Sequence, residues 1–78
     1  MAATAIAKRS LVIDGHRTSV SLEDAFWRRL RAIAKERGVS LNRLVAEIDH
    51  DRDGNLSSAI RLFVLDTLTA DQRHKGQP

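Results

Sequence analysis

The chain has 78 residues, a formal net charge of +3 and a sequence pI of about 10.2. This length predicts one small domain whose single core barely offsets the entropy of ordering the chain. The absence of cysteine excludes a disulfide framework, and no apolar run approaches the roughly 18 residues of a membrane span. We therefore expect a cytoplasmic protein with no membrane partner, stabilised by burial between two copies of the chain in an obligate homodimer.

The charge is unevenly distributed along the chain. Up to residue 43 there are nine basic and four acidic residues, whereas from residue 44 onward four basic residues face six acidic ones. A basic region of this kind favours a partner that carries phosphate groups. A solvated helix face is the alternative explanation for such a cluster.

The N-terminal part of the chain predicts a short leader and then a β-hairpin. The stretch "MAATAIAKRS" lacks the basic start and long hydrophobic core of a signal peptide, so we expect residues 1–8 to form a flexible leader instead. In "SLVIDGHRTSVSL" a two-residue turn at Asp14-Gly15 pairs Ile13 with His16 and Val12 with Arg17. Alternation then predicts an apolar face of Leu11, Ile13, Thr18, Val20 and Leu22, and a polar, cationic face of Lys8, Ser10, Val12, Arg17, Ser19 and Ser21.

A first amphipathic helix is predicted from Glu23 to Arg37. Ser21 and Asp24 resemble a capping box at its start, and Gly38 stands where a left-handed residue ends a helix. The apolar residues recur at helical spacing, and for Phe26 and Trp27 this favours a place in the core over a stacking platform for nucleic-acid bases. The predicted buried positions are Phe26, Trp27, Leu30, Ile33 and Ala34.

Two further helices are predicted. The second begins with Ser40 as its N-cap, and an acidic turn interrupts it. The third, "NLSSAIRLFVLDTL", is capped by Asn55 or Ser57 and continues to Leu68. The folded domain is then expected to span residues 9–68, followed by a disordered tail over 69–78. The apolar faces comprise Leu41, Leu44, Val45 and Ile48 in the second helix, and Leu56, Ile60, Phe63, Val64 and Leu68 in the third.

The acidic stretch "DHDRDGNLSSAI", Asp49 to Ile60, resembles a calcium-binding loop in the spacing of its first acidic residues. Its twelfth position, where such a loop has a bidentate glutamate, is Ile60, an apolar residue of the predicted third helix. Weak calcium binding is therefore a minor alternative to a helix–helix turn, and we expect no metal site. The chain also has no nucleophile–base motif and no glycine-rich phosphate loop, so we expect neither a cofactor nor an enzyme.

The stretch "RTSVSLEDAFWRRLRAIAKERGVSLNRLVAEID", followed by "GNLSSAIRLFVL", resembles a family of short bacterial proteins with the ribbon-helix-helix fold, which is MetJ/Arc-like. The resemblance covers about residues 9–65. It implies an α+β, mainly helical fold in an intertwined homodimer, with an N-terminal hairpin, two core helices and a third C-terminal helix. It also implies double-stranded DNA as the partner, with a β-ribbon in the major groove, and transcriptional regulation as the function.

Carried onto this sequence, the resemblance assigns two sets of DNA-contacting residues. Arg17, Ser19 and Ser21 face outward on the strand and would read bases. The N-terminus of the second helix would hold a phosphate, with additional contacts from basic side chains. The implied phosphate-binding set is Ser40, Asn42, Arg43, Lys8 and Arg9.

Each of these residues also has a purely structural explanation. Ser21 could cap the first helix, Ser40 could cap the second helix without binding phosphate, and Arg17 could be an ordinary exposed strand residue.

The hairpin itself leaves the DNA-binding mode open. If two hairpins pair edge to edge, four strands span about 14 Å, against a major groove about 12 Å wide. Either the outer arms bend away, or the sheet binds something other than duplex DNA. The alternative function is thus a dimeric protein-interaction module, antitoxin-like or an adaptor, that recognises a protein partner without binding DNA directly.

Overall fold

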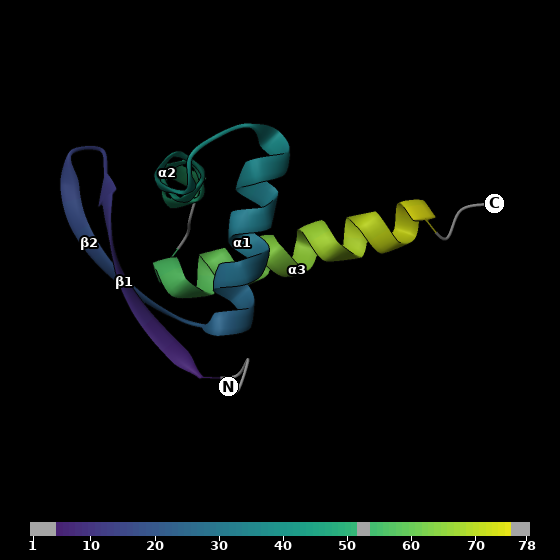
Figure 1. The fold of residues 1–78 in the computed structure, drawn as a ribbon, viewed down its shortest axis with the longest axis horizontal. Coiled ribbons are helices and arrows are strands. Elements are labelled where there is room, and N and C mark those ends of the chain that lie inside the picture. Colours follow the sequence, from purple (N-terminus) through teal and green to yellow (C-terminus); the bar gives the residue numbers. More distant parts are fainter. Residues whose placement is uncertain (1–4, 52–53, 76–78) are drawn as a thin grey trace.

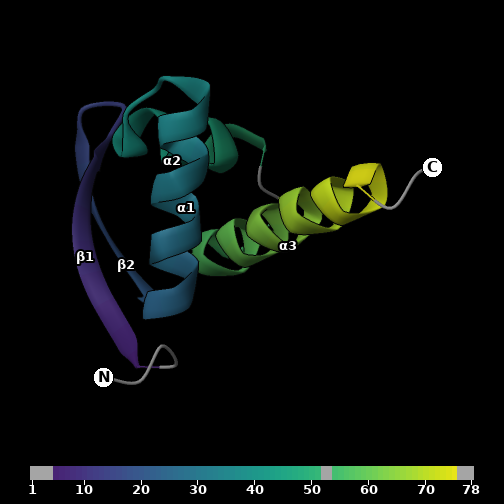
Figure 2. The same cartoon turned by 45° about the vertical axis from the view of Figure 1, so that its right-hand side comes forward.

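The computed structural model describes residues 5–51 and 54–75 of the chain. Two antiparallel strands form a hairpin, and the three helices all lie on one side of it (Figure 1, Figure 2). This is the predicted α+β, mainly helical architecture. The elements are β1 (Ile6–Ile13), β2 (His16–Glu23), α1 (Asp24–Arg37), α2 (Leu41–Asp51) and α3 (Leu56–Lys75).

The hairpin has the register that its turn predicts. Ile13 pairs with His16 across Asp14 and Gly15, whose φ angles of 52° and 81° are those that an Asn-Gly or Asp-Gly turn adopts. The strands extend further than expected, because β1 begins at Ile6 within the expected leader. The added residues have backbone partners: Ile6 pairs with Glu23, and the Asp24 N–H donates to the Ala5 carbonyl at 2.8 Å.

The inner face of the hairpin closes the hydrophobic core. Its four apolar side chains Leu11, Ile13, Val20 and Leu22 are buried against the helices, as the alternation predicts. One chain thus closes a core of its own, and the intertwined homodimer stays a prediction. The helical side of this core comprises Trp27, Leu30, Ile33, Ala34, Leu44, Val45, Ile48, Ile60 and Val64, with Phe26, Leu41 and Phe63 packed partly buried around it.

The ends of α1 confirm one prediction and correct another. Gly38 has φ 69° and ψ 29°, the left-handed conformation expected after the last turn, and backbone bonds to Ala34 and Lys35 close the helix. The capping box was wrong, because the N-cap is Glu23 and no side chain caps this helix. Strand β2 continues to Glu23, so Ser21 is still a strand residue.

The caps of the other two helices are as predicted. The Arg43 N–H donates to Ser40 Oγ at 3.1 Å, and the Ser58 N–H donates to Asn55 Oδ1 at 3.2 Å. Helix α3, however, continues beyond Leu68 to Lys75, where the sequence had suggested a disordered tail. No glycine or proline interrupts Leu56–Lys75, so nothing in the local sequence ends the helix earlier. Its C-terminal half extends away from the other elements (Figure 1, Figure 2).

The acidic segment does not form the loop of a calcium site. Asp49 and Asp51 belong to the last turn of α2, so the interruption predicted for this helix comes later than expected. At the other end, Ile60 lies within α3 and is completely buried. A calcium loop wraps its first, third and twelfth positions around the ion, and helical backbone at both ends prevents this. Asp53, the third acid of the pattern, lies outside the described residues.

Candidate nucleic-acid interface

The outer face of the hairpin exposes a polar, cationic surface. Three cross-strand pairs cover it: Lys8 with Ser21, Ser10 with Ser19, and Val12 with Arg17. All six side chains are exposed, and Val12 retains 52% of its accessible surface. The three proposed base readers Arg17, Ser19 and Ser21 therefore stand in one row along β2. We call this six-residue surface the hairpin face.

Both cations of the hairpin face are available to a partner. Within the described part of the chain, neither Lys8 nor Arg17 has an acidic partner. The only acid on the same side of β2 is Glu23, at the end of the strand, and it is bound to Arg61. The face therefore presents positive charge with little local compensation, as an anionic partner requires.

The structure separates Arg9 from Lys8. Arg9 pairs with the buried Val20, so its side chain leaves the sheet on the helical side. Its guanidinium carbon lies 5.7 Å from the centre of the Trp27 ring, a cation–π contact. The strand alternation that placed Lys8 on the outer face also predicts this opposite direction for Arg9.

A hydrogen bond from Trp27 links α1 to the start of β1. The indole is completely buried, and its Nε1–H donates to the Ala7 carbonyl at 2.8 Å. This confirms the prediction that Trp27 belongs to the core, and it leaves no face of the ring for a nucleic-acid base.

The N-terminus of α2 is a second, separate candidate site. Ser40 Oγ is the cap described above, and Asn42 is exposed beside it. Arg43 makes a loose ion pair with Glu47 at 3.6 Å, between two largely exposed side chains. At the other end of α2, His50 Nε2 lies 2.9 Å from Asp14 Oδ2 in the hairpin turn. In one chain, this helix start lies on the helical side of the sheet, away from the hairpin face (Figure 1).

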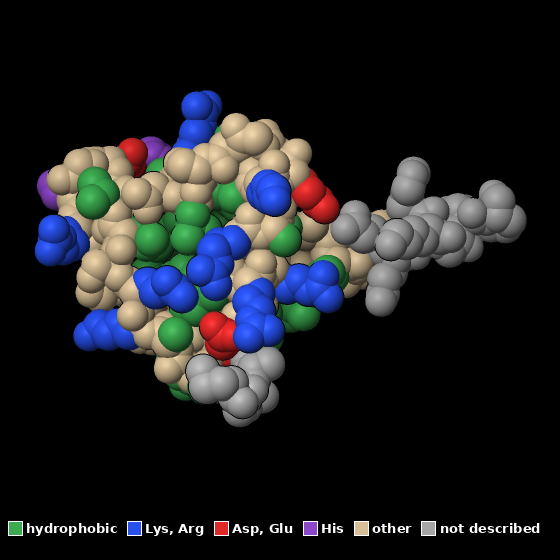
Figure 3. Space-filling view, viewed as in Figure 1, with side chains coloured by type: hydrophobic (Ala, Val, Ile, Leu, Met, Phe, Trp, Pro, Cys, Tyr) green, Lys and Arg blue, Asp and Glu red, His purple; other side chains and the backbone are tan. Residues whose placement is uncertain are grey.

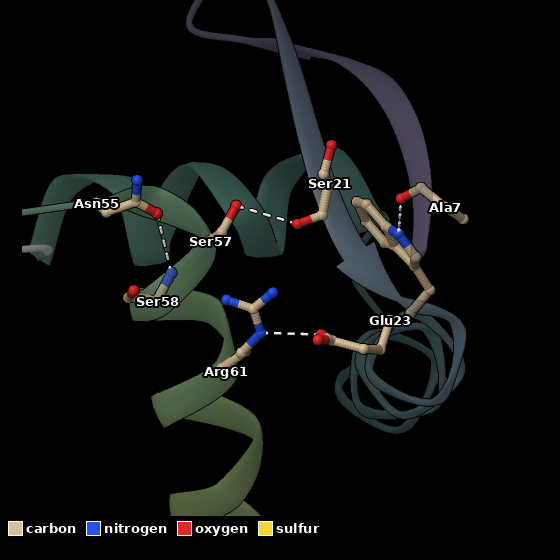
Figure 4. Close-up of polar contacts among 8 residues, drawn as sticks. Ala7, Ser21, Glu23, Asn55, Ser57, Ser58 and Arg61 are labelled. Carbon is tan, nitrogen blue, oxygen red and sulfur yellow. Dashed lines mark hydrogen bonds and ion pairs between the residues drawn. The ribbon is translucent and has the colours of Figure 1, made fainter. Parts of the chain in front are cut away.

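A clasp between α3 and the end of β2 is a feature that the sequence did not reveal. Ser57 Oγ donates to the Ser21 carbonyl at 3.2 Å, and Arg61 Nε donates to Glu23 Oε1 at 2.9 Å (Figure 4). The Arg61 guanidinium also lies 6.0 Å from the Phe26 ring centre. The hydrogen bond from Arg61 lowers the pKa of Glu23, helped by the backbone of Glu23 itself, although partial burial opposes the shift. The clasp thus fixes the strand end that carries Ser21.

A further set of cations lies on α1, apart from the hairpin face. In Figure 3, Lys and Arg side chains are spread both along the hairpin edge and over the helices. Arg28 is bound to Asp24 at 2.8 Å in an i,i+4 pair typical of a solvated helix face. The positive first half of the sequence is therefore divided between two surfaces. The exposed basic residues of α1 are Arg28, Arg29, Arg31, Lys35 and Arg37.

A β-ribbon with a cationic outer face, followed by helices that close its inner face, defines a ribbon-helix-helix domain. The ribbon-helix-helix domain family matches residues 6–68, and the chain belongs to this family. Proteins of the family are commonly DNA-binding transcription regulators or antitoxins, are typically non-enzymatic and typically form dimers.

A solved structure has the same fold. An uncharacterized protein from Bordetella pertussis Tohama I superposes with a TM-score of 0.73 at 29% sequence identity. The match covers 91% of this chain and 63% of that chain, so the present chain spans less than two thirds of its length. Among curated proteins, none matches this chain. Of the helices within the described residues, none is both long and apolar enough to cross a membrane.

Proposed function

We propose that this protein is a homodimeric DNA-binding transcriptional regulator of the bacterial cytoplasm, and that the hairpin face is the surface that meets the duplex. The observation that carries the proposal is the sorting of the hairpin: every apolar residue predicted for the inner face is buried, while Lys8 and Arg17 are exposed without acidic partners in the described part of the chain. Family membership supports the same function.

The dimensions of the hairpin favour insertion of one hairpin into one stretch of major groove. Two strands are about 4.8 Å apart, which leaves room for side chains in a groove about 12 Å wide. A four-stranded sheet made from two hairpins would span about 14 Å and would have to bend. We therefore assign one hairpin to each half-site, with the two half-sites related by the two-fold axis of the dimer.

Five of the six residues of the hairpin face have a defined role in this arrangement. Arg17 donates to the O6 and N7 of guanine, and Ser19 and Ser21 make less selective contacts with base edges. Val12, which lies opposite Arg17, is suited to a thymine methyl group. Lys8 lies at the far end of the face, where it meets the phosphate backbone.

The start of α2 is proposed as a separate phosphate contact. Its free N–H groups and helix dipole favour an anion, and Asn42 and Arg43 stand next to the Ser40 cap. Because this end lies on the helical side of the sheet, the phosphate it binds belongs to the flank of the groove. Arg9, directed toward Trp27, is the weakest member of the phosphate set.

Selection of bound duplexes from a random pool tests the proposal directly. Arg17→Ala should then weaken binding to the selected sequence about tenfold or more and relax the preference at one base pair, as loss of a bidentate guanine contact does. Arg31→Ala is the matched control, because it removes the same charge from an exposed position on α1. It should lower affinity only slightly, and equally for all sequences.

Two outcomes would contradict the proposal. If no sequence is enriched and binding at low salt is equally weak for all duplexes, the hairpin face does not read DNA. If DNA is bound but Arg17→Ala and Arg31→Ala weaken binding equally, Arg17 is not a base reader. In the first case the dimeric protein-interaction module, without direct DNA binding, becomes the better function.

A further inference from the structure

A groove lies between α2 and α3, and the proposed DNA contact does not use it. Its volume is about 620 Å³, within the range of sites that hold ligands or segments of other proteins. The hairpin contributes no residue to it. The parts of the lining that carry the argument are an apolar floor and wall, Leu44, Ile48, Leu62 and Phe63, and a charged rim, Arg37, Glu47, Asp51 and Asp66.

The apolar part of the groove is incompletely covered. Leu44 and Ile48 are buried and form the floor, but Leu62 stands on the wall with 66% of its surface exposed. When a partner covers an exposed leucine beside an apolar floor, the binding is favoured, because apolar surface of both molecules is removed from water. The groove therefore offers apolar surface that a partner's apolar side chains could cover.

The rim of the groove is acidic. Glu47 and Asp51 stand on α2 and Asp66 on α3; Arg37 is the only cation of the lining, and Glu47 is loosely paired with Arg43 beside it. Arg37 is held over the Phe63 ring, with its guanidinium carbon 5.2 Å from the ring centre. Within the described part of the chain, Asp51 and Asp66 have no ion-pair partner. The rim thus repels a phosphate backbone and attracts cationic side chains.

Neither the same groove nor the most cationic helix of a second copy is a good occupant. Two such grooves facing each other across a two-fold axis would bring Asp51 and Asp66 near the same acids of the partner, which is unfavourable. The most cationic element, α1, exposes arginines and lysines together with Ala25 and Ala32, but none of its large apolar side chains is fully exposed. It therefore cannot supply the apolar row that Leu62 requires.

We propose that the α2–α3 groove binds an amphipathic helix of a partner protein, with leucine-like side chains on one face and lysine or arginine on both flanks. The apolar row covers Leu62 and Phe63, and the flanking cations meet Asp51 and Asp66. This is helix-in-groove recognition, in which spaced apolar anchors give affinity and flanking charges select the partner. It goes beyond the proposed DNA contact and uses none of its residues.

Selection from a displayed library of helical peptides, with the full chain as bait, tests this site. The library varies the apolar and flanking positions freely, so its enrichment reports what the groove prefers. We expect peptides with leucines at i, i+3 or i+4, and i+7 and with cationic flanks, and binding that weakens as salt rises. The affinity of an enriched peptide should fall at least about tenfold for Leu62→Asp and should also fall for Asp66→Lys.

Leu65→Asp is the matched control. Leu65 is 51% exposed on the same helix but lines a smaller hollow between α1 and α3, so its replacement should leave peptide binding unchanged. Both leucines are exposed, and thermal melting should show that both variants fold.

Three outcomes overturn the proposal: enrichment of acidic or uncharged peptides, equal losses for Leu62→Asp and Leu65→Asp, or no peptide that depends on Leu62. Sedimentation provides a fourth: if the wild type is an oligomer that Leu62→Asp converts to monomer, a second copy fills the groove instead. DNA binding by Leu62→Asp should match the wild type, so failure here is distinguishable from failure of the hairpin face.

Discussion

At the scale of single residues, Trp27 joins the strand that starts the hairpin to the core. Its ring is completely buried, its N–H holds the Ala7 carbonyl, and Arg9 covers the ring from the β1 side. A tryptophan with its polar group satisfied inside a core provides both a large buried surface and a fixed orientation. Trp27 thus adds a side-chain contact to the backbone bonds that hold the start of β1.

Replacement of this tryptophan tests that contribution. Trp27→Phe removes the donor to Ala7 and leaves unfilled space, so it should destabilise the fold by about 2 kcal/mol, combining the two costs. Urea denaturation measures this, and hydrogen exchange should be faster in residues 6–9. Phe26→Leu, at the half-buried neighbouring position, should cost less than about 1.5 kcal/mol. Equal effects would show that the hydrogen bond and complete burial of Trp27 add nothing.

Glu23 is a second residue whose surroundings have a measurable effect, in this case on the pH dependence of stability. It ends β2, serves as N-cap residue of α1 and accepts a hydrogen bond from Arg61 on α3. The pKa of Glu23 is lowered mainly by this Arg61 bond. A carboxylate with a lowered folded-state pKa stabilises the fold at pH values above its ordinary value, and this contribution disappears as the pH falls through the folded-state pKa.

The pH dependence of Glu23→Gln should show this contribution. At pH 7 the wild type should melt at a higher temperature than Glu23→Gln, and the difference should shrink as the pH falls below the ordinary glutamate value of 4.5. Glu36→Gln, at an exposed position of α1, serves as the control and should melt in parallel with the wild type. A difference between wild type and Glu23→Gln that is constant from neutral pH down to about pH 3 would refute the role of the clasp.

At the scale of elements, the start of α2 combines a structural and a proposed functional role. The Ser40 hydroxyl already satisfies the Arg43 N–H, so capping needs no ligand. A phosphate at the same place would add to this cap, because helix N-termini attract anions. Stability and DNA affinity can therefore be separated by the choice of substitution.

Two substitutions at Ser40 separate these roles. Ser40→Ala removes the cap and should cost about 1 kcal/mol of stability. Ser40→Asp keeps a capping oxygen and should preserve stability, but its negative charge should lower DNA affinity by repelling the phosphate. Thermal melts and gel shifts on the same two variants measure both effects. Undiminished DNA binding by Ser40→Asp would show that no phosphate approaches this helix.

At the scale of the whole molecule, opposite charges occupy different surfaces. The hairpin face carries Lys8 and Arg17, whereas the α2–α3 groove is bordered by Glu47, Asp51 and Asp66. If both proposals hold, such a distribution would let one small domain contact nucleic acid and a cationic protein segment at the same time. Outside these two surfaces, the exposed apolar residues Ile6 and Leu65 mark further surface available for association.

The proposed homodimer predicts a concentration-dependent stability. If the folded state contains two chains, a tenfold increase in protein concentration favours it by about 1.4 kcal/mol per dimer, which should raise Tm by several degrees. Melts from low to high micromolar concentration, with sedimentation at both ends, measure this. A concentration-independent Tm with a monomeric mass would contradict the dimer, in agreement with a core that one chain closes alone.

Much of the fold was predictable because its signals are local. Asp14-Gly15 defines the turn, and the turn fixes which residues pair and hence which face each side chain occupies. Gly38 and Ser40 mark helix ends through conformations and hydrogen bonds within a few residues. For the candidate site, this local register was sufficient to place Arg17, Ser19 and Ser21 on one exposed face.

By itself, then, the sequence determined the hairpin register, the inner and outer faces, the Gly38 terminus and the Ser40 cap, because each depends on neighbours along the chain. Only the tertiary structure decided the clasp of Ser57 and Arg61 to β2, whose partners are 36 and 38 residues apart, and the acidic groove between α2 and α3. Those features depend on the packing of whole helices against one another, and no short-range pattern encodes that packing.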